Sequence, residues 1–385
     1  MSLDIDRFAS RFCKSVRDWY DTDEFIPLHA PKLNGNEESY VREVVQSTFV
    51  SSVGQKIIDF ERAMCAYLGV KHAVAMVNGT AALHMALLGA GVTRDSLVIT
   101  QSLSFVATAN AIAYVGANPV FLDVDPETLS LSPQKVREWL VENTFECNGV
   151  RVCKSSGLRV SALVPMHTFG FVGDIQALIK VAEEFRIPLV EDAAESLGSE
   201  VAGVHPGNFG LCAAISFNGN KILTTGGGGM VVTNNDELAV RVRHLSTTAK
   251  VPHRWEYIHD EVGFNYRMPN INAGLGLAQL EQLPDFLADK RALALYYADF
   301  FHGTSARFIR EPASNTANYW LCSALFETGL ERERFLELTN DAGIMTRPAW
   351  EPLHKLIPFR TARTGDLRVT MDIASRLVNI PSSVR

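Results

Sequence analysis

The chain has 385 residues, of which 47% are hydrophobic and 21% are charged, and its formal net charge is −7. This composition is typical of a globular chain with two domains and excludes a largely disordered one. The chain has no basic stripe interleaved with aromatic residues, which argues against nucleic acid as a partner.

No apolar run approaches the roughly 20 residues of a membrane span. The start of the chain carries Asp4, Asp6 and Arg7 in place of a signal sequence, so we expect a cytoplasmic protein that needs no membrane. The six cysteines lack metal-ligand spacing, and we expect no metal.

Residues 1–30 are predicted to form an N-terminal extension. From Arg7 onward the pattern is amphipathic, which predicts a helix packed on the body of the protein or on a partner. Strand and helix signals then alternate from about 74 to 238, the pattern of a mainly parallel sheet covered on both faces. The sequence therefore predicts an α/β fold with a large domain over 31–248 and a small α+β domain over 249–385.

A strand that turns into a helix predicts an anion site near residue 79. The apolar run 73–77 leads into Asn78, Gly79 and Thr80, and helical spacing follows as far as residue 88. Gly79 permits a close turn, Thr80 offers a hydroxyl and an N–H, and the amino end of the helix carries partial positive charge. A phosphate group suits such a turn, and Ser216 could add a second hydroxyl.

Two more strand ends offer an aromatic ring and a carboxylate. Residues 101–110 again pass from strand to helix, and Phe105 could stack on a planar ligand, although a phenylalanine alone is more often a core residue. Residues 185–190 resemble a parallel strand that ends near Asp192, at the edge where α/β sheets bind ligands. Asp192 would keep a pyridine nitrogen protonated, although alone it could be a helix N-cap.

Lys221 lies between two short apolar runs, 213–217 and 230–233, in a turn that ends in the glycines 226–229. Such a turn holds the amine close to the core, and an ammonium group partly removed from water binds its proton less tightly. The amine is then a candidate nucleophile for a carbonyl, as a Schiff base with pyridoxal phosphate requires. A lysine beside glycine is common in ordinary turns, so the prediction depends on the phosphate turn, ring, aspartate and lysine occurring together.

The last third of the chain predicts the small α+β domain. A helical stretch over 271–301, broken near Pro284, leads into a strand over 318–326, a helix over 331–342 and the segment 344–347. Before these elements, the polar segment 143–159 is predicted to be a surface excursion.

These motifs resemble those of the DegT/StrS-type nucleotide-sugar aminotransferases, which have the aspartate-aminotransferase fold (fold type I). The resemblance runs from about Pro27 to near the end of the chain. It is carried by NGTAALH (78–84), SFVATANAI (104–112), VEDAAESLGS (190–199), SFNGNKILTTGGGGM (216–230) and GFNYRMPNINAGLGLAQL (263–280).

The resemblance implies a role for each matching residue. It implies that Lys221 is the Schiff-base lysine, that Asp192 pairs with the pyridine nitrogen and that Phe105 stacks on the ring. It also implies that the phosphate is held by Thr80, Ala81 and Ser216, and by Asn265 from a neighbouring subunit. The active unit would then be a homodimer with shared active sites.

Glu195 departs from the family pattern, because many relatives have Gln or His at this position. A carboxylate there must share a proton or find a cation. Glu195 accepts a hydrogen bond from a protonated ring hydroxyl of the cofactor, or else it forms a salt bridge that faces away from the cofactor. The sequence leaves both alternatives open.

The candidate substrate contacts are Ser52 in the loop 49–54, Lys250 and His354. We expect these side chains to contact the sugar or the diphosphate. A lone histidine is more often a surface or core residue than a ligand. Three arginines could pair with a phosphate or equally with structural carboxylates: Arg254, Arg267 and Arg347.

The segments FVSSVG (49–54), PMHTFG (165–170), TTAKVPHRWEYIHDE (247–261) and VNIPSS (378–383) resemble enzymes of the legionaminic-acid or bacillosamine type. That resemblance implies amino transfer from glutamate to carbon 4 of a UDP-linked 4-keto-6-deoxy-N-acetylhexosamine, in the synthesis of bacterial surface polysaccharide. A second hypothesis is a different keto-sugar nucleotide, with the ketone at carbon 3 or with a dTDP or GDP carrier. A sugar 3-dehydratase has histidine in place of the Schiff-base lysine and is disfavoured by Lys221. A non-catalytic regulatory protein of the same fold is the remaining hypothesis.

Overall fold

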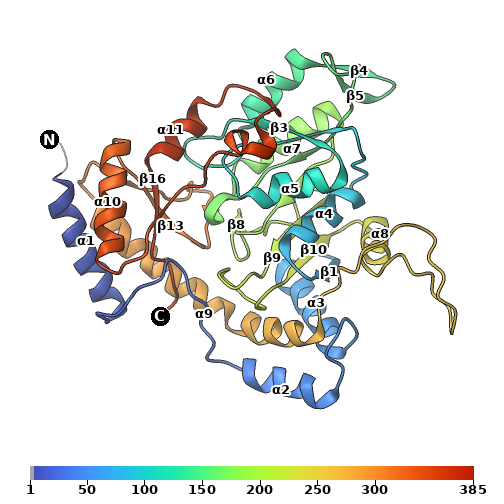
Figure 1. Cartoon of the computed structure of the whole chain (residues 1–385), viewed down its shortest axis with the longest axis horizontal. Coiled ribbons are helices and arrows are strands. Elements are labelled where there is room, and N and C mark those ends of the chain that lie inside the picture. The colour runs from blue at the N-terminus through green and yellow to red at the C-terminus, as the bar shows by residue number, and fades with distance from the viewer. Residues whose placement is uncertain (1–3) are drawn as a thin grey trace.

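A mixed and mainly parallel sheet forms the centre of the computed structural model, which describes residues 4–385 (Figure 1). The strands lie in the order β1-β10-β9-β7 and β6-β2-β3-β15, and a parallel bridge between Leu163 and Leu189 joins the two halves. β10 runs antiparallel to both neighbours, and the other pairs are parallel. The strands are β1 (His72–Met76), β10 (Gly229–Thr233), β9 (Cys212–Ser216), β7 (Val190–Asp192), β6 (Val160–Val164), β2 (Leu97–Gln101), β3 (Asn118–Leu122) and β15 (Arg363–Thr364). The prediction of a mainly parallel sheet is confirmed.

Helices cover both faces of this sheet. One face packs against α4 (Gly79–Gly89), α5 (Val106–Val115) and α8 (Asp236–Ser246). The other face packs against α3 (Gln55–Leu68), α6 (Pro133–Asn143), α7 (Ile175–Phe185) and the first half of α9 (Asn270–Phe301). Within β2, Val98 points to the first layer, whereas Leu97 and Ile99 point to the second. Alternate side chains of a strand point to opposite faces, so a strand buried on both sides is apolar along its whole length.

A second core lies at one end of the molecule (Figure 1). An antiparallel sheet in the order β11-β13-β16-β14 packs with α10 (Gly329–Asp341) and α11 (Arg368–Arg376). Its strands are β11 (Arg307–Phe308), β13 (Cys322–Leu325), β16 (Leu377–Ile380) and β14 (Arg347–Pro348). The first helix, α1 (Ile5–Tyr20), joins this core through Phe12, whose ring centroid lies 5.0 Å from that of Phe335. The amphipathic N-terminal helix therefore packs on the body of its own chain.

One expectation about local structure is wrong, and the expected surface excursion is confirmed as an ordered, exposed hairpin. The helix α9 is not broken at Pro284 and runs continuously through it. Tertiary packing overrides the proline, because the first half of α9 contacts α2 (Glu37–Ser47) and α3 while the second half is buried in the second core. The segment 143–159 is a hairpin of β4 (Thr144–Cys147) and β5 (Val150–Cys153). Its turn residues Asn148 and Gly149 both have positive φ, at 51° and 79°, which is the geometry that an Asn-Gly turn favours.

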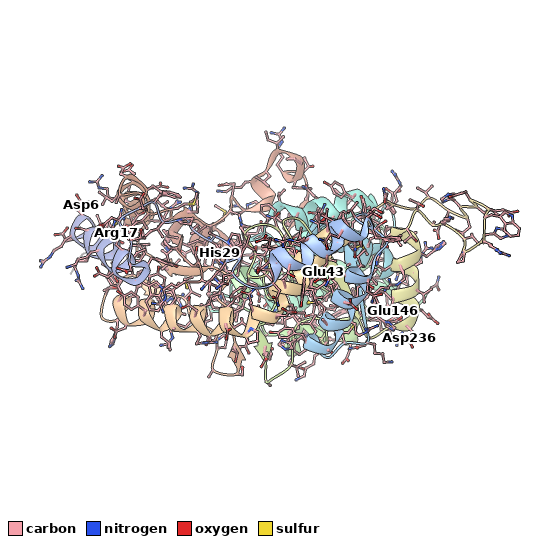
Figure 2. The ribbon with its side chains drawn as sticks, turned by 90° about the horizontal axis from the view of Figure 1, so that it is seen from below. Asp6, Arg17, His29, Glu43, Glu146 and Asp236 are labelled. Atoms are coloured by element: carbon pink, nitrogen blue, oxygen red, sulfur yellow. The ribbon has the colours of Figure 1, made fainter. Side chains whose placement is uncertain are left out.

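The remaining elements are short connections. They are the pair β8 (Glu200–Val201) and β12 (Asn315–Thr316), and single turns of 3-10 helix, η1 (Thr168–Gly170), η2 (Leu353–Lys355) and η3 (Ile357–Phe359). Residues 249–262 project from the body after α8, as both whole-chain views show (Figures 1 and 2). None of the helices within residues 4–385 combines the length and the hydrophobicity of a membrane span. The domain boundaries at 30 and 248 stay predictions, because α9 contributes to both cores.

Candidate active site

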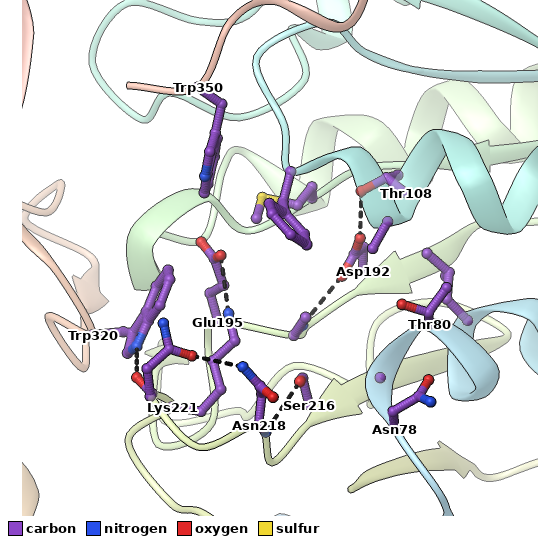
Figure 3. Close-up of a pocket in the computed structure, with 17 residues that line it drawn as sticks. Asn78, Thr80, Thr108, Asp192, Glu195, Ser216, Asn218, Lys221, Trp320 and Trp350 are labelled. Carbon is purple, nitrogen blue, oxygen red and sulfur yellow. Dashed lines mark hydrogen bonds and ion pairs between the residues drawn. The ribbon is translucent and has the colours of Figure 1, made fainter. Parts of the chain in front are cut away.

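A cavity of about 390 Å³ opens at the edge of the central sheet where β7 and β9 end (Figure 3). The helices α4 and α5 begin at the same edge. Six of the side chains predicted from the sequence line this cavity: Thr80, Phe105, Asp192, Glu195, Ser216 and Lys221. The fold thus brings together residues that are spread from position 80 to position 221 of the chain.

The turn before α4 has the form of an anion site. Asn78 caps the helix, since its Oδ1 accepts a hydrogen bond of 2.8 Å from the N–H of Ala81. The N–H groups of Gly79 and Thr80 belong to the first turn, which has no carbonyl partners inside the helix, and both residues line the cavity. A Cβ on Gly79 would stand 2.7 Å from Cβ of Ser216, so glycine is what lets the serine hydroxyl approach this turn. Two N–H groups, two hydroxyls and a helix amino end suit a phosphate group.

Asp192 lies at the end of β7 and is only 4% exposed. Its Oδ2 accepts a hydrogen bond of 2.7 Å from the Thr108 hydroxyl, and its Oδ1 accepts one of 3.2 Å from the N–H of Ala194. Burial raises the pKa of the Asp192 carboxyl, and the bond from Thr108 opposes that effect. Neither hydrogen-bond donor carries a charge. A protonated ring nitrogen placed in the cavity would supply the cation that a buried carboxylate needs.

Lys221 and Glu195 form an ion pair inside the cavity, with 3.1 Å between Nζ and Oε1. The side chain of Lys221 is 12% exposed and that of Glu195 is 2% exposed. Oε2 of Glu195 also accepts a hydrogen bond of 2.8 Å from the N–H of Phe169. Burial raises the pKa of Glu195 to about 7, whereas the Lys221 ammonium and the Phe169 N–H act in the opposite direction. Of the two alternatives for Glu195, the structure therefore shows the salt bridge. Its partner is Lys221, however, and the pair faces into the cavity and not away from it.

Aromatic rings form the walls of the cavity. Phe105 is half exposed, and its ring centroid lies 6.2 Å from that of Trp350. The Nζ of Lys221 lies 3.6 Å from the ring centroid of Trp320. An exposed phenylalanine beside a cavity leaves one ring face available to a planar ligand.

The sequence analysis missed Thr108, Trp320 and Trp350, which also line the cavity. A signal existed for Thr108, because it lies three residues after Phe105 at the start of a helix, where such residues share a face. Trp320 and Trp350 lie in segments more than 90 residues from Lys221, and nothing in their local pattern marks them as cavity residues.

The other predicted residues lie outside this cavity. Ala81 borders an adjoining cavity of about 260 Å³ with Asn78 and Thr80. Ser52 and Asn265 are exposed. Lys250 lies 3.9 Å from the ring centroid of Tyr257 and borders a third cavity. The roles proposed for them stay predictions.

His354 is held 2.7 Å from the Ser102 hydroxyl through Nδ1, and its role also stays a prediction. Burial lowers the pKa of His354 below its ordinary value. Of the three arginines that could bind a phosphate, Arg267 instead pairs with Glu61 at 2.7 Å and is structural.

The cavity fits pyridoxal phosphate in four respects. Its anion turn would hold the phosphate, the donors to its buried Asp192 among residues 4–385 are the uncharged Thr108 and Ala194, and its lysine amine reaches the same space. A half-exposed phenylalanine borders the space where a ring would lie.

Comparisons with known proteins agree with this geometry. The model of the DegT/DnrJ/EryC1/StrS aminotransferase family matches residues 31–385. A GDP-perosamine synthase of Caulobacter vibrioides is 36% identical over 361 residues, covering 93% of each chain. One of Escherichia coli O157:H7 is also 36% identical, with 93% of each chain covered. The crystal structure of the aminotransferase TlmJ from Streptoalloteichus hindustanus superposes with a TM-score of 0.83 at 30% identity, covering 92% of this chain and 93% of that one. The chain therefore belongs to the DegT/DnrJ/EryC1/StrS family of pyridoxal-phosphate-dependent sugar aminotransferases.

Proposed function

We propose that this protein transfers an amino group from glutamate to the keto carbon of a nucleotide-linked 4-keto-6-deoxy sugar, with Lys221 as its catalytic residue. The observation that carries the proposal is the placement of the Lys221 amine and the buried Asp192 carboxylate in one cavity with an anion turn. Bound pyridoxal phosphate would supply an electron sink for negative charge at the carbon that gains or loses the amino group. The protein supplies binding, orientation and proton transfer.

Each residue has a defined part in that reaction. Asp192 would keep the ring nitrogen of the bound cofactor protonated, Phe105 would stack on its ring, and its phosphate would be held by Thr80, Ala81 and Ser216. Lys221 would hold the bound cofactor, and its free amine would carry the proton at the reacting carbon. In the cofactor-free protein burial raises the pKa of Glu195 to about 7, and its carboxylate lies 3.1 Å from the Lys221 amine, so Glu195 would exchange a proton with that amine near neutral pH.

The nucleotide of the substrate is inferred from relatives and from sequence segments. The names of two relatives at 36% identity favour a GDP-linked sugar. The resemblance of the segments 49–54 and 247–261 to legionaminic-acid or bacillosamine enzymes favours a UDP-linked N-acetylhexosamine. We therefore place GDP first and keep UDP as the alternative, with Ser52, Lys250 and His354 as candidate contacts for the sugar or diphosphate in either case.

We also propose a homodimer in which Asn265 of the partner subunit completes the phosphate site. Asn265 is exposed in its own chain, at the base of the projecting segment 249–262. That segment exposes large apolar side chains, with Trp255 at 69% and Tyr257 at 81%, and such a surface is typical of an interface. A mixture of Asn265→Ala and Lys221→Ala proteins would then regain activity, because a mixed dimer contains one intact site. Two variants that stay inactive after unfolding and refolding together would contradict shared sites.

The central experiment fixes the cofactor to the protein with borohydride and locates the modified residue by peptide mass spectrometry. We expect modification at Lys221, with none in Lys221→Ala and a normal result in the control Lys180→Ala, which changes an exposed lysine on α7. Addition of glutamate before borohydride should abolish fixation, because the amine has been released. Fixation at another lysine would refute the assignment.

The substrate is then tested with GDP-, UDP- and dTDP-linked 4-keto-6-deoxy sugars in parallel. Turnover of the GDP sugar supports the proposal, and turnover of only the UDP N-acetyl sugar supports the alternative. Fixation at Lys221 with no turnover of any of these sugars would show that the substrate class is wrong while the catalytic residue is right.

A further inference from the structure

Lys221 has a second contact inside the cavity besides Glu195. Its Nζ lies 3.6 Å from the ring centroid of Trp320, so the ammonium group rests on the face of the indole (Figure 3). Trp320 is only 5% exposed and comes from the segment just before β13, about 100 residues later in the chain. A cation over the face of tryptophan is held electrostatically, most strongly when both groups are removed from water.

The indole is itself tied to the turn that carries Lys221. The Nε1–H of Trp320 donates a hydrogen bond of 2.6 Å to the carbonyl of Asn220, the residue before the lysine. The ring therefore contacts the end of the Lys221 side chain and the backbone at its base. This double contact fixes the direction in which the lysine side chain extends.

The side chain of Asn318 connects the two partners of Lys221. Its amide N–H₂ donates to the carbonyls of Glu195 at 2.9 Å and Leu197 at 2.8 Å, and its Oδ1 accepts from the N–H of Trp320 at 2.8 Å. Glu195 and Trp320 therefore keep a constant spacing.

Lys290 holds the same segment through its backbone carbonyls. It lies on α9, is 1% exposed, and donates hydrogen bonds to the carbonyls of Tyr319 at 3.1 Å, Trp320 at 3.2 Å and Ser382 at 2.5 Å. Tyr319 has a φ of 48°, in the left-handed region that costs free energy for a residue other than glycine. The Lys290 bonds therefore hold a strained peptide in place.

Burial of the Lys290 ammonium group costs folding free energy, which a purely structural role does not explain. Its three hydrogen-bond acceptors are all neutral carbonyls, and burial lowers the pKa of its ammonium group to about 7. The neighbouring His29 does not offset the positive charge of Lys290. Burial and the two nearby lysines, Lys290 and Lys221, hold the pKa of His29 well below its ordinary value, so its ring is neutral. A methionine would fill much of the same space without burying a charged group.

We propose that the ring of Trp320 binds the Lys221 amine whenever that amine is free of the cofactor, and that Lys290 is a positioning residue that holds Trp320 in place. The inference rests on the proposed function, in which Lys221 is the catalytic residue. The indole and the Glu195 carboxylate hold the free amine inside the cavity, where Lys221 would be placed to carry the proton at the reacting carbon. Without Trp320, the four-carbon side chain has more rotamers available and spends less time in the reactive one.

The test compares the chemical reactivity of Lys221 in cofactor-free protein by competitive reductive methylation and peptide mass spectrometry, with the exposed Lys180 as internal reference. Trp320→Leu should raise the methylation rate of Lys221 about fivefold, because a cation–π contact no longer restrains the amine. Lys290→Met should also raise the methylation rate of Lys221, although this substitution alters nothing on the cavity surface. Trp19→Leu is the matched control, since Arg385 lies 3.8 Å from that ring centroid in another part of the molecule; it should leave the Lys221 rate unchanged.

Steady-state kinetics give the second readout. Trp320→Leu and Lys290→Met should lower kcat about tenfold or more with little change in the KM for the sugar nucleotide, since the amine and not the substrate is misplaced. Trp320→Phe, which keeps a ring face but loses the N–H, should fall between wild type and Trp320→Leu.

A wild-type methylation rate and kcat in folded Lys290→Met would overturn the positioning role, and the same result in Trp320→Leu would overturn the whole inference. If Lys290→Met does not fold, the methylation rates and kcat values of Trp320→Leu and Trp320→Phe test whether Trp320 holds the Lys221 amine. Failure of the proposed function is separate, because borohydride would then fix the cofactor at a residue other than Lys221 in wild-type protein.

Discussion

Replacing Glu195 with glutamine tests how strongly burial controls the charge in the cavity. Burial raises the pKa of Glu195 from the ordinary 4.5 to about 7 in the cofactor-free protein. A carboxyl whose pKa is raised on folding binds its proton more tightly in the folded state than in the unfolded state. Its contribution to stability is therefore complete below pH 4.5 and is lost as the pH rises through about 7.

The size of the stability change follows from the interval between the ordinary pKa of Glu195, 4.5, and its raised pKa of about 7. At about 1.4 kcal/mol per pH unit, the shift corresponds to about 3 kcal/mol of unfolding free energy. Glu195→Gln keeps the shape of the protonated acid but cannot ionise. Relative to this variant, wild-type protein should lose about 3 kcal/mol of stability between pH 4.5 and pH 8.

Urea denaturation of the cofactor-free proteins at several pH values measures this difference, because other titrating groups cancel between wild type and variant. Glu327→Gln, at an exposed position, is the control and should match wild type at each pH. A stability difference between wild type and Glu195→Gln that stays constant from pH 4.5 to pH 8 would refute the reasoning. A difference that changes in the opposite direction would show that the Lys221 ion pair outweighs burial.

Four further changes test the site and the fold. Asp192→Asn should lower the rate of the half-reaction with glutamate by about 100-fold, because the ring nitrogen loses its charged partner; stopped-flow absorbance measures it, and a change under threefold would contradict the role. Gly79→Ala should weaken binding of pyridoxal phosphate at least about tenfold, since its Cβ would lie 2.7 Å from Cβ of Ser216; an absorbance titration measures the Kd, and a wild-type Kd would exclude the turn as the phosphate site. Thr108→Val removes the hydroxyl that donates to Asp192 at 2.7 Å and should destabilise the protein by about 1–3 kcal/mol; an unchanged urea midpoint would show that this bond is not needed. Phe12→Ala should cost about 3–5 kcal/mol, because this fully buried ring ties α1 to α10; a much smaller cost would mean that α1 is only loosely attached.

The sequence by itself determined the order of strands and helices in the large part and the residues that end up at the edge of its sheet. Those residues could be identified because their environment is local: Gly79 and Thr80 belong to a turn and a helix start, and Asp192 follows its own strand directly. The same kind of local reasoning failed at Pro284, because packing on both halves of α9 outweighs the hydrogen bond that the proline removes. It also missed the hairpin 144–153, although its Asn-Gly turn is a recognisable signal.

Only the tertiary structure decided what surrounds the Lys221 amine. Glu195 was compatible with two orientations, and the position of the backbone after β7 directs it toward the lysine. Trp320 reaches the site from about 100 residues away in sequence, and Lys290, about 70 residues away, holds it from outside the cavity; both contacts are hydrogen bonds to backbone carbonyls. Any residue type presents such carbonyls, so contacts of this kind leave no pattern in the amino-acid sequence, and only the folded chain shows which carbonyls lie within reach.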